Sequence, residues 1–325
     1  MLLKIIHNNK IGAYAFMLLL MLLFWLKPLL LGYDLNIASF DDAMPLWKLF
    51  SFVLTAPWLG FLFSFLSAIV VTLSITRFNS KYGLLGKQSA LPGIVFVLLI
   101  GGISFTLQFN PFWLITVFFV VSLDYLFTAH NHRKVMRTCF LAALWVSVAS
   151  LFSYKVVLLF PLLLIWIIIM RLLNFKSFLA MLIGLVLPWL FLLGTELIWG
   201  GLPDFFSHIS FSWGKITETY QHTTFNLIYL VAIAFIFIIS ILSVISAYGT
   251  KKIFTRKQYL VFIYSTLYLS GVLLFTGIHL EIFILLAVPS SIVIAHLINK
   301  IRSIWWQNIL VAYLFLLAIA GQIMM

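Results

Sequence analysis

The chain of 325 residues is 64% hydrophobic and 9% charged, whereas about a quarter of the residues of an ordinary soluble domain are charged. Its formal net charge of +12 would suggest nucleic acid in a soluble protein. Here the basic residues lie in short turns between apolar runs, so we expect no nucleic-acid partner and instead contact with a lipid bilayer. One cysteine, Cys139, excludes an internal disulfide and a Cys-rich metal site.

Eleven apolar runs follow one another along the chain. The first is about 21 residues long, enough to cross ~30 Å of hydrocarbon at 1.5 Å per residue. We therefore predict an all-α, polytopic helical membrane protein of about 11 transmembrane helices, with 1–325 as a single integral membrane domain and no soluble domain. The expected spans are 11–31, 52–75, 91–108, 112–129, 138–153, 156–173, 178–199, 226–248, 259–276, 282–298 and 305–324.

Two features qualify these spans. The run 138–153 is short, and only three residues separate it from 156–173, so the pair is open to being a hairpin that just reaches the outer interface. Prolines 57, 161, 188 and 289 fall inside their expected spans. A proline there can kink a membrane helix while neighbouring helices satisfy the freed carbonyls.

The charges of the connectors alternate along the chain. Sixteen of the 20 Lys and Arg residues fall in every second connector, and the exceptions are Lys27, Lys48, Lys155 and Lys215. All acids except Asp124 fall on the other side of the expected membrane. Short basic loops are retained in the cytoplasm. We therefore expect a bacterial inner-membrane protein with its N-terminus inside and its C-terminus outside.

The longest connector, 200–225, is too short to fold independently. Any chemistry must therefore take place within the bilayer or at its surfaces. Inside the membrane the ionisable candidates are Lys27, Asp124 and Glu196, all near span ends, where water or an oppositely charged partner explains each of them.

The first candidate site is the pair Asp41 and Asp42 in the first outer loop. Paired carboxylates at a membrane surface can bind a hard cation or act as a general base. The alternative is that they solvate the loop and help to cap an interfacial helix beginning near Pro45, because acids stabilise a helix N-terminus.

The second candidate is a set of outer histidines and acids, of which His222, His279 and Glu281 are the expected substrate-binding residues. The full set is Asp204, His208, Glu218, His222, His279 and Glu281. His208 follows Asp204, and His222 follows Glu218, by four residues, so each pair shares a face if its stretch is helical. Solvated loop residues are the alternative explanation for most of the set, and no metal site is predicted.

Four further histidines fall on the cytoplasmic side: His7, His130, His132 and His296. Together they are the kind of set that could form an iron site. However, His130 and His132 lie in a basic turn that needs no metal to explain it, so we expect none here.

Two regions resemble an uncharacterised bacterial family of multi-pass inner-membrane proteins, often labelled beta-carotene monooxygenase. One runs from TRFN at 76–79 through LQFNP at 107–111, and the other is MRLLNFK at 170–176 followed by GLVLP at 184–188. The resemblance extends over nearly the whole chain. In that family an acidic residue usually follows the second basic position of the cytoplasmic turn, whereas here Ser177 follows Lys176.

A broader resemblance is to membrane glycosyltransferases that use polyprenyl-phosphate sugars. Those proteins also start inside, cross about eleven times and carry an acidic pair in the first outer loop, as Asp41 and Asp42 stand here. Their first outer loop carries interfacial helices and is usually longer than this one. The resemblance implies catalysis by Asp41 or Asp42 at the outer, periplasmic face.

The sequence leaves two functions open. One is an accessory or structural subunit of a cell-envelope assembly, with an envelope protein as partner. The other is a reduced membrane glycosyltransferase acting on a lipid-linked substrate at the outer face. No cofactor is indicated for either function.

Overall fold

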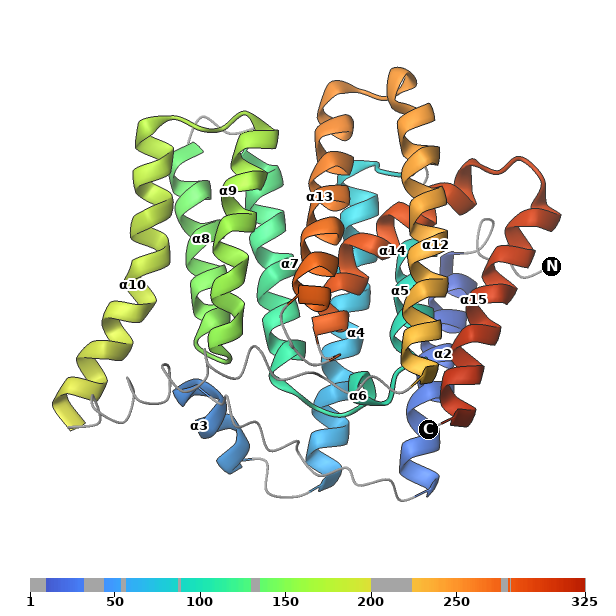
Figure 1. The fold of residues 1–325 in the computed structure, drawn as a ribbon, viewed down its shortest axis with the longest axis horizontal. Helices are drawn as coiled ribbons and strands as arrows, with labels where there is room; N and C mark the ends of the chain where they lie inside the picture. Colours follow the sequence, from blue (N-terminus) through green and yellow to red (C-terminus); the bar gives the residue numbers. More distant parts are fainter. Residues whose placement is uncertain are drawn as a thin grey trace.

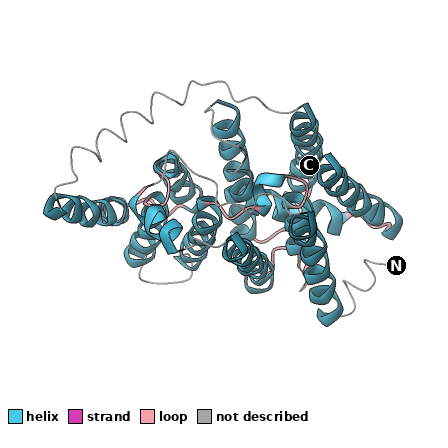
Figure 2. Cartoon of the chain, turned by 90° about the horizontal axis from the view of Figure 1, so that it is seen from below, coloured by secondary structure: helices cyan, strands magenta, loops and turns pink. Residues whose placement is uncertain are grey.

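The computed structural model describes residues 10–31, 44–53, 57–86, 89–129, 135–199, 224–275, 280 and 282–324. Every regular element in these ranges is a helix, and Figure 2 shows the helices nearly end-on. The elements are α2 (Lys10–Leu31), α3 (Pro45–Val53), α4 (Pro57–Tyr82), α5 (Leu91–Ile100), α6 (Ser104–Leu107), α7 (Pro111–Ala129), α8 (Val135–Ser150), η1 (Tyr154–Leu158), α9 (Leu159–Met170), α10 (Phe175–Trp199), α12 (Thr224–Ser246), η3 (Tyr248–Thr250), α13 (Ile253–Phe275), α14 (Ile282–Lys300) and α15 (Ile304–Met324).

Six of these helices are long and apolar enough to cross a membrane: Trp58–Tyr82, Pro111–Ala129, Phe175–Ile198, Leu227–Ser246, Ile282–Lys300 and Ile304–Ile323. Shorter apolar helices accompany them at Ile11–Leu26, Leu91–Ile100, Val135–Ser150 and Tyr154–Met170. The expectation of an all-helical membrane protein is thereby confirmed in its general form.

Helix α14 forms the centre of the bundle. Its residues from Ile282 to Ile298 are all buried, and it packs against α5, α7, α12, α13 and α15. Helix α5 is buried along its whole length between α14, α4, α15 and α2. A helix that is apolar on all sides, as both are, is typical of the interior of a membrane bundle.

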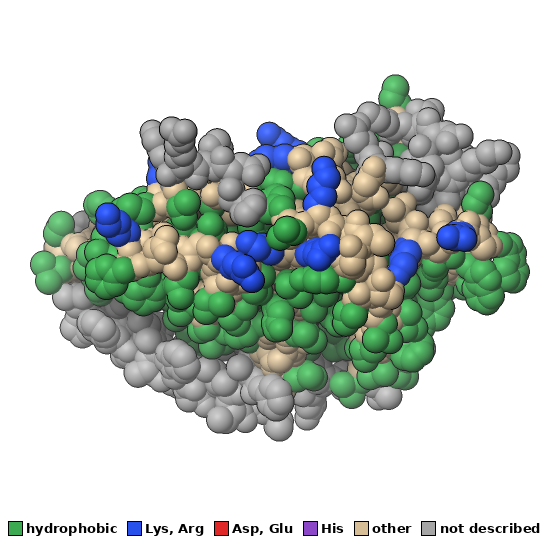
Figure 3. Space-filling model, turned by 90° about the horizontal axis from the view of Figure 1, so that it is seen from above, with side chains coloured by type: hydrophobic (Ala, Val, Ile, Leu, Met, Phe, Trp, Pro, Cys, Tyr) green, Lys and Arg blue, Asp and Glu red, His purple; other side chains and the backbone are tan. Residues whose placement is uncertain are grey.

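The described basic turns share one end of the bundle. In Figure 1 the connections from α4 to α5, α9 to α10, α12 to α13 and α14 to α15 all lie at the top. Figure 3 shows this end, where Lys and Arg side chains gather and no described Asp or Glu side chain is visible. We call it the basic end, and the opposite end the outer end.

Several expected boundaries shift. Pro57 begins α4 and does not lie within it, and the helix runs on to Tyr82, so that Arg77 and Lys81 fall in its last turns. Pro161 lies in the first turn of α9, whereas Pro188 and Pro289 lie inside their helices as predicted. Proline is favoured in the first turn, where its missing N–H has no intrahelical acceptor.

Helices α8 and α9, joined through η1, form the helical hairpin considered from the sequence, and α10 packs on α8. Gly184 allows the close approach of α10, because a Cβ atom there would lie 2.5 Å from the carbonyl oxygen of Phe140. One turn later, Pro188 removes an N–H from the helix ladder. The Ser147 hydroxyl of α8 donates to the carbonyl of Leu185 at 2.5 Å.

The expected span 91–108 is interrupted: α5 ends at its tenth residue and a turn leads to α6. Side chains from other segments satisfy the carbonyls that this break frees. The Tyr229 hydroxyl donates to Leu99 O (2.7 Å), Thr106 Oγ1 donates to the last carbonyl of α5 (2.5 Å), and Gln322 Nε2 donates to Gly101 O (2.6 Å). Irregular backbone inside a membrane protein is tolerated where it is buried and satisfied in this way.

Glycines let these groups come together at the break. A Cβ atom at Gly101 would lie 2.5 Å from the Phe24 ring, and one at Gly102 would lie 2.6 Å from the Tyr229 ring. Opposite them, a Cβ atom at Gly321 of α15 would lie 2.1 Å from the Gly102 carbonyl oxygen. The break is therefore a closely packed junction of α2, α5, α12 and α15.

Candidate functional site

The five residues that the sequence favours for a site are Asp41, Asp42, His222, His279 and Glu281. All five lie outside the described residues. Their assignment as catalytic and substrate-binding residues therefore stays a prediction.

Described residues beside these positions anchor the outer end. Leu280, between His279 and Glu281 in the sequence, is fully buried, and its carbonyl accepts the N–H of Phe283 at 3.0 Å. This contact fixes the start of α14 against the core. Helix α12 begins at Thr224, two residues after His222.

Helix α3 is the described element closest in sequence to Asp41 and Asp42. Its start is defined by the carbonyl of Met44, which accepts the N–H groups of Trp47 (2.9 Å) and Lys48 (3.1 Å), with Pro45 at the first helical position. A helix therefore begins at Pro45, where the sequence predicts one. Figure 1 shows α3 lying across the outer end of the bundle, beneath α8 and α9.

Aromatic side chains hold α3 to the bundle. The Trp47 ring is buried, 5.4 Å from the Phe109 ring in the turn before α7, and the Phe50 ring lies 6.0 Å from the Phe152 ring after α8. On its other side α3 exposes Leu49. Helix α3 thus buries Trp47 and exposes Lys48, Leu49 and part of Phe50.

Met44 extends this contact to α10. It forms a small core cluster, separate from the main core, with Leu151, Tyr154 and Leu192. Trp189 packs against the same cluster. We call α3 together with this cluster the outer platform. It connects the turn between α8 and η1 to α10. In the sequence it begins at Met44, two residues after Asp42.

At the basic end, Asp124 has the oppositely charged partner expected from its position near a span end. Lys81 Nζ lies 2.6 Å and 2.8 Å from its two carboxylate oxygens, and the Tyr82 hydroxyl donates to the same carboxylate at 2.8 Å. Both charged side chains are partly exposed, at 36% and 42%. Such a pair contributes about 0–1 kcal/mol to stability. Together with the Tyr82 hydrogen bond it connects the end of α4 to α7.

His296 is the one member of the cytoplasmic histidine set within the described residues, and it is buried in α14 against the Tyr259 ring at 5.0 Å. Nearby, Lys251 Nζ lies 4.7 Å from the centre of the same ring. Burial and the neighbouring Lys300 ammonium lower the pKa of Lys251. Across the described ranges, no three His, Cys, Asp or Glu side chains are placed to hold a metal ion.

The sequence reasoning missed the outer platform, although part of its signal was present. Trp47 and Phe50 are three residues apart, a helical spacing that places them on one face. Their partners Phe109 and Phe152 come from turns far along the chain, and no local pattern connects them.

Comparison with protein families identifies the family of this chain. A family of unknown function, DUF6427, matches residues 44–324. No curated protein matches the chain, and no solved structure does.

Proposed function

Since the chain belongs to DUF6427, a family of unknown function, we propose its function from the geometry: a reduced membrane glycosyltransferase that acts on a lipid-linked substrate at the outer face of a bacterial inner membrane. The observation that carries this proposal is the outer platform. It supplies a short helix after the first apolar run, and the polyprenyl-phosphate-dependent enzymes carry interfacial helices in the corresponding loop.

The proposed topology has eleven spans, with the N-terminus inside and the C-terminus outside. It is supported by the gathering of described basic turns at one end, because short basic loops stay in the cytoplasm. A reporter active only outside the cytoplasm should be active when fused after Gly214 and inactive when fused after Lys252. The reverse pattern would refute the orientation.

The proposed chemistry is transfer of a sugar from a lipid phosphate. Asp41 or Asp42 takes the proton of the acceptor hydroxyl as that oxygen bonds to the anomeric carbon, and the bond from this carbon to the lipid phosphate breaks with its electrons going to the phosphate. His222, His279 and Glu281 bind the lipid-linked substrate near its phosphate. Helix α3 would keep the first outer loop at the membrane surface, where such a substrate is presented.

A second function, an accessory subunit of an envelope assembly, is favoured by one observation on α10. This helix packs mainly on α8, and Figure 1 shows its lower half leaning away from the other helices. Its outer half exposes Leu190, Phe191, Leu197 and Ile198. This surface could contact either lipid or a helix of another membrane protein.

Mass spectrometry of the gently purified protein separates the two functions. An enzyme should co-purify with a polyprenyl phosphate, and the double variant Asp41→Asn with Asp42→Asn should retain the uncleaved sugar-bearing lipid. Asp204→Asn, which removes another outer acid, should behave as the wild type. A stoichiometric protein partner in place of the lipid would support the accessory function and reject the enzyme, and so would a double variant whose bound lipid matches the wild type.

A further inference from the structure

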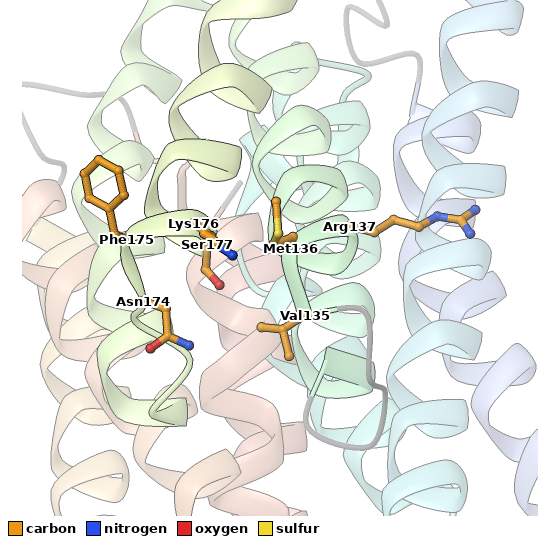
Figure 4. A pocket seen from close by; sticks show the side chains of 7 residues that line it. All are labelled: Val135, Met136, Arg137, Asn174, Phe175, Lys176 and Ser177. Carbon is orange, nitrogen blue, oxygen red and sulfur yellow. The ribbon is translucent and has the colours of Figure 1, made fainter.

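A cavity of about 790 Å³ lies between the first turns of α8 and α10 at the basic end. Figure 4 shows Val135 and Met136 of α8 on one side, with Asn174, Lys176 and Ser177 on the other. We call it the α8–α10 cavity. It includes the end of the MRLLNFK stretch, whose role the proposed function leaves open.

The first turn of α10 supplies hydrogen-bond donors to the cavity. The first intrahelical bond of α10 runs from the Phe178 N–H to Asn174 O at 2.8 Å, so the N–H groups of 175–177 have no intrahelical acceptor. The Ser177 side chain is 2% exposed and lines the cavity, yet it has no hydrogen-bond partner among the described residues. The hydroxyl oxygen is not fully enclosed by protein atoms, so a ligand in the cavity can reach it.

The charge of the cavity favours an anion. The positive ends of two helix dipoles, those of α8 and α10, meet here, and N–H groups at a helix N-terminus bind phosphate readily. Lys176 adds a full positive charge from the same turn, whereas Figure 4 shows the Arg137 side chain extending away from the rest. No Asp or Glu is among the described residues that line the cavity.

The rim of the cavity is apolar. Phe175 is 80% exposed and Met136 is 50% exposed, at the basic end of two helices whose sides face the bilayer in the proposed topology. A phosphate site with exposed apolar side chains beside it matches a lipid, whose acyl chains begin where its headgroup ends. We propose that the α8–α10 cavity binds the phosphate headgroup of an anionic phospholipid from the leaflet at the basic end.

The test measures lipid binding by native mass spectrometry of the full chain in detergent. We expect phosphatidylglycerol to bind more tightly than phosphatidylcholine. The double variant Lys176→Gln with Ser177→Ala should weaken phosphatidylglycerol binding by about tenfold or more, because hydrogen bonds to a charged group are among the stronger ones. Lys176→Arg should retain most of the binding, and so should the control Lys252→Gln, which removes a charge elsewhere at the same end.

Equal binding by the wild type and the double variant would overturn the proposal, and so would an equal loss in Lys252→Gln, which would indicate a diffuse effect of charge. Inorganic phosphate forms a further arm: if it displaces the lipid at equal concentration, the site belongs to a free phosphate and the lipid assignment is wrong. A thermal unfolding curve of each variant shows whether it is folded. If the double variant is misfolded, the single variant Ser177→Ala is measured in its place. Loss of its preference for phosphatidylglycerol over phosphatidylcholine supports the proposal, and an unchanged preference refutes it.

Discussion

The hydroxyl of Tyr229 should be worth about 1–2 kcal/mol to the stability of the bundle. It lies 2.7 Å from Leu99 O and 3.4 Å from Leu98 O, so it makes one close hydrogen bond. The side chain is 1% exposed, and Tyr229→Phe would leave a carbonyl that water cannot reach. A buried polar group that loses its partner costs about 1–3 kcal/mol, while hydrogen bonds within membrane proteins average about 0.6 and reach about 1.7 kcal/mol.

The free energy of unfolding can be measured in mixed micelles by raising the fraction of an anionic detergent and following tryptophan fluorescence. Tyr264→Phe is the matched control, because Tyr264 is 48% exposed and has no hydrogen-bond partner in the described part of the chain. The control should stay within about 0.5 kcal/mol of the wild type. A Tyr229→Phe protein as stable as this control would show that the bond does not support the break.

Two further predictions concern packing and charge. Gly184→Ala should lower the free energy of unfolding by about 1–3 kcal/mol, because its Cβ would meet the Phe140 carbonyl. The control is Gly194→Ala on the same helix, where a Cβ meets nothing within 4 Å, and it should be neutral or slightly stabilising. Equal effects of the two substitutions would contradict the packing argument. The lowered pKa of Lys251 means that the unfolded chain holds this proton more tightly, so stability should rise with pH from the lowered pKa up to the usual 10.5. Lys251→Met should flatten that rise in unfolding measurements across this window, and an unchanged slope would refute it.

The sequence predicts what depends on local composition. The general membrane fold follows from the apolar runs, and the start of α3 follows from Pro45, because proline is favoured at the first helical position. The end of α5 at Ile100 was missed, although Gly101 and Gly102 stand in the sequence. Two glycines in an apolar run do not by themselves break a membrane helix. The break is stable here because Tyr229 and Gln322, both far along the chain, donate hydrogen bonds to two of its carbonyls.

The candidate sites show the same division. Charge alternation could select Asp41 and Asp42, and these remain predictions. In the sequence Ser177 stands out only as a departure from the pattern of the resembled family, because no local pattern indicates that Val135 of α8 lines the same cavity. Sites formed by contact between helices need the three-dimensional arrangement.

The break in α5 also has a consequence for biogenesis. Helices enter the membrane in chain order, yet the carbonyl of Gly101 bonds to Gln322 in the last described helix. Until α12 and then α15 have been inserted, the carbonyls of Leu99 and Gly101 therefore lack the donors that they have in the folded bundle. A chain cut before α15 would keep this polar end exposed, a signal by which membrane quality control could recognise unfinished copies.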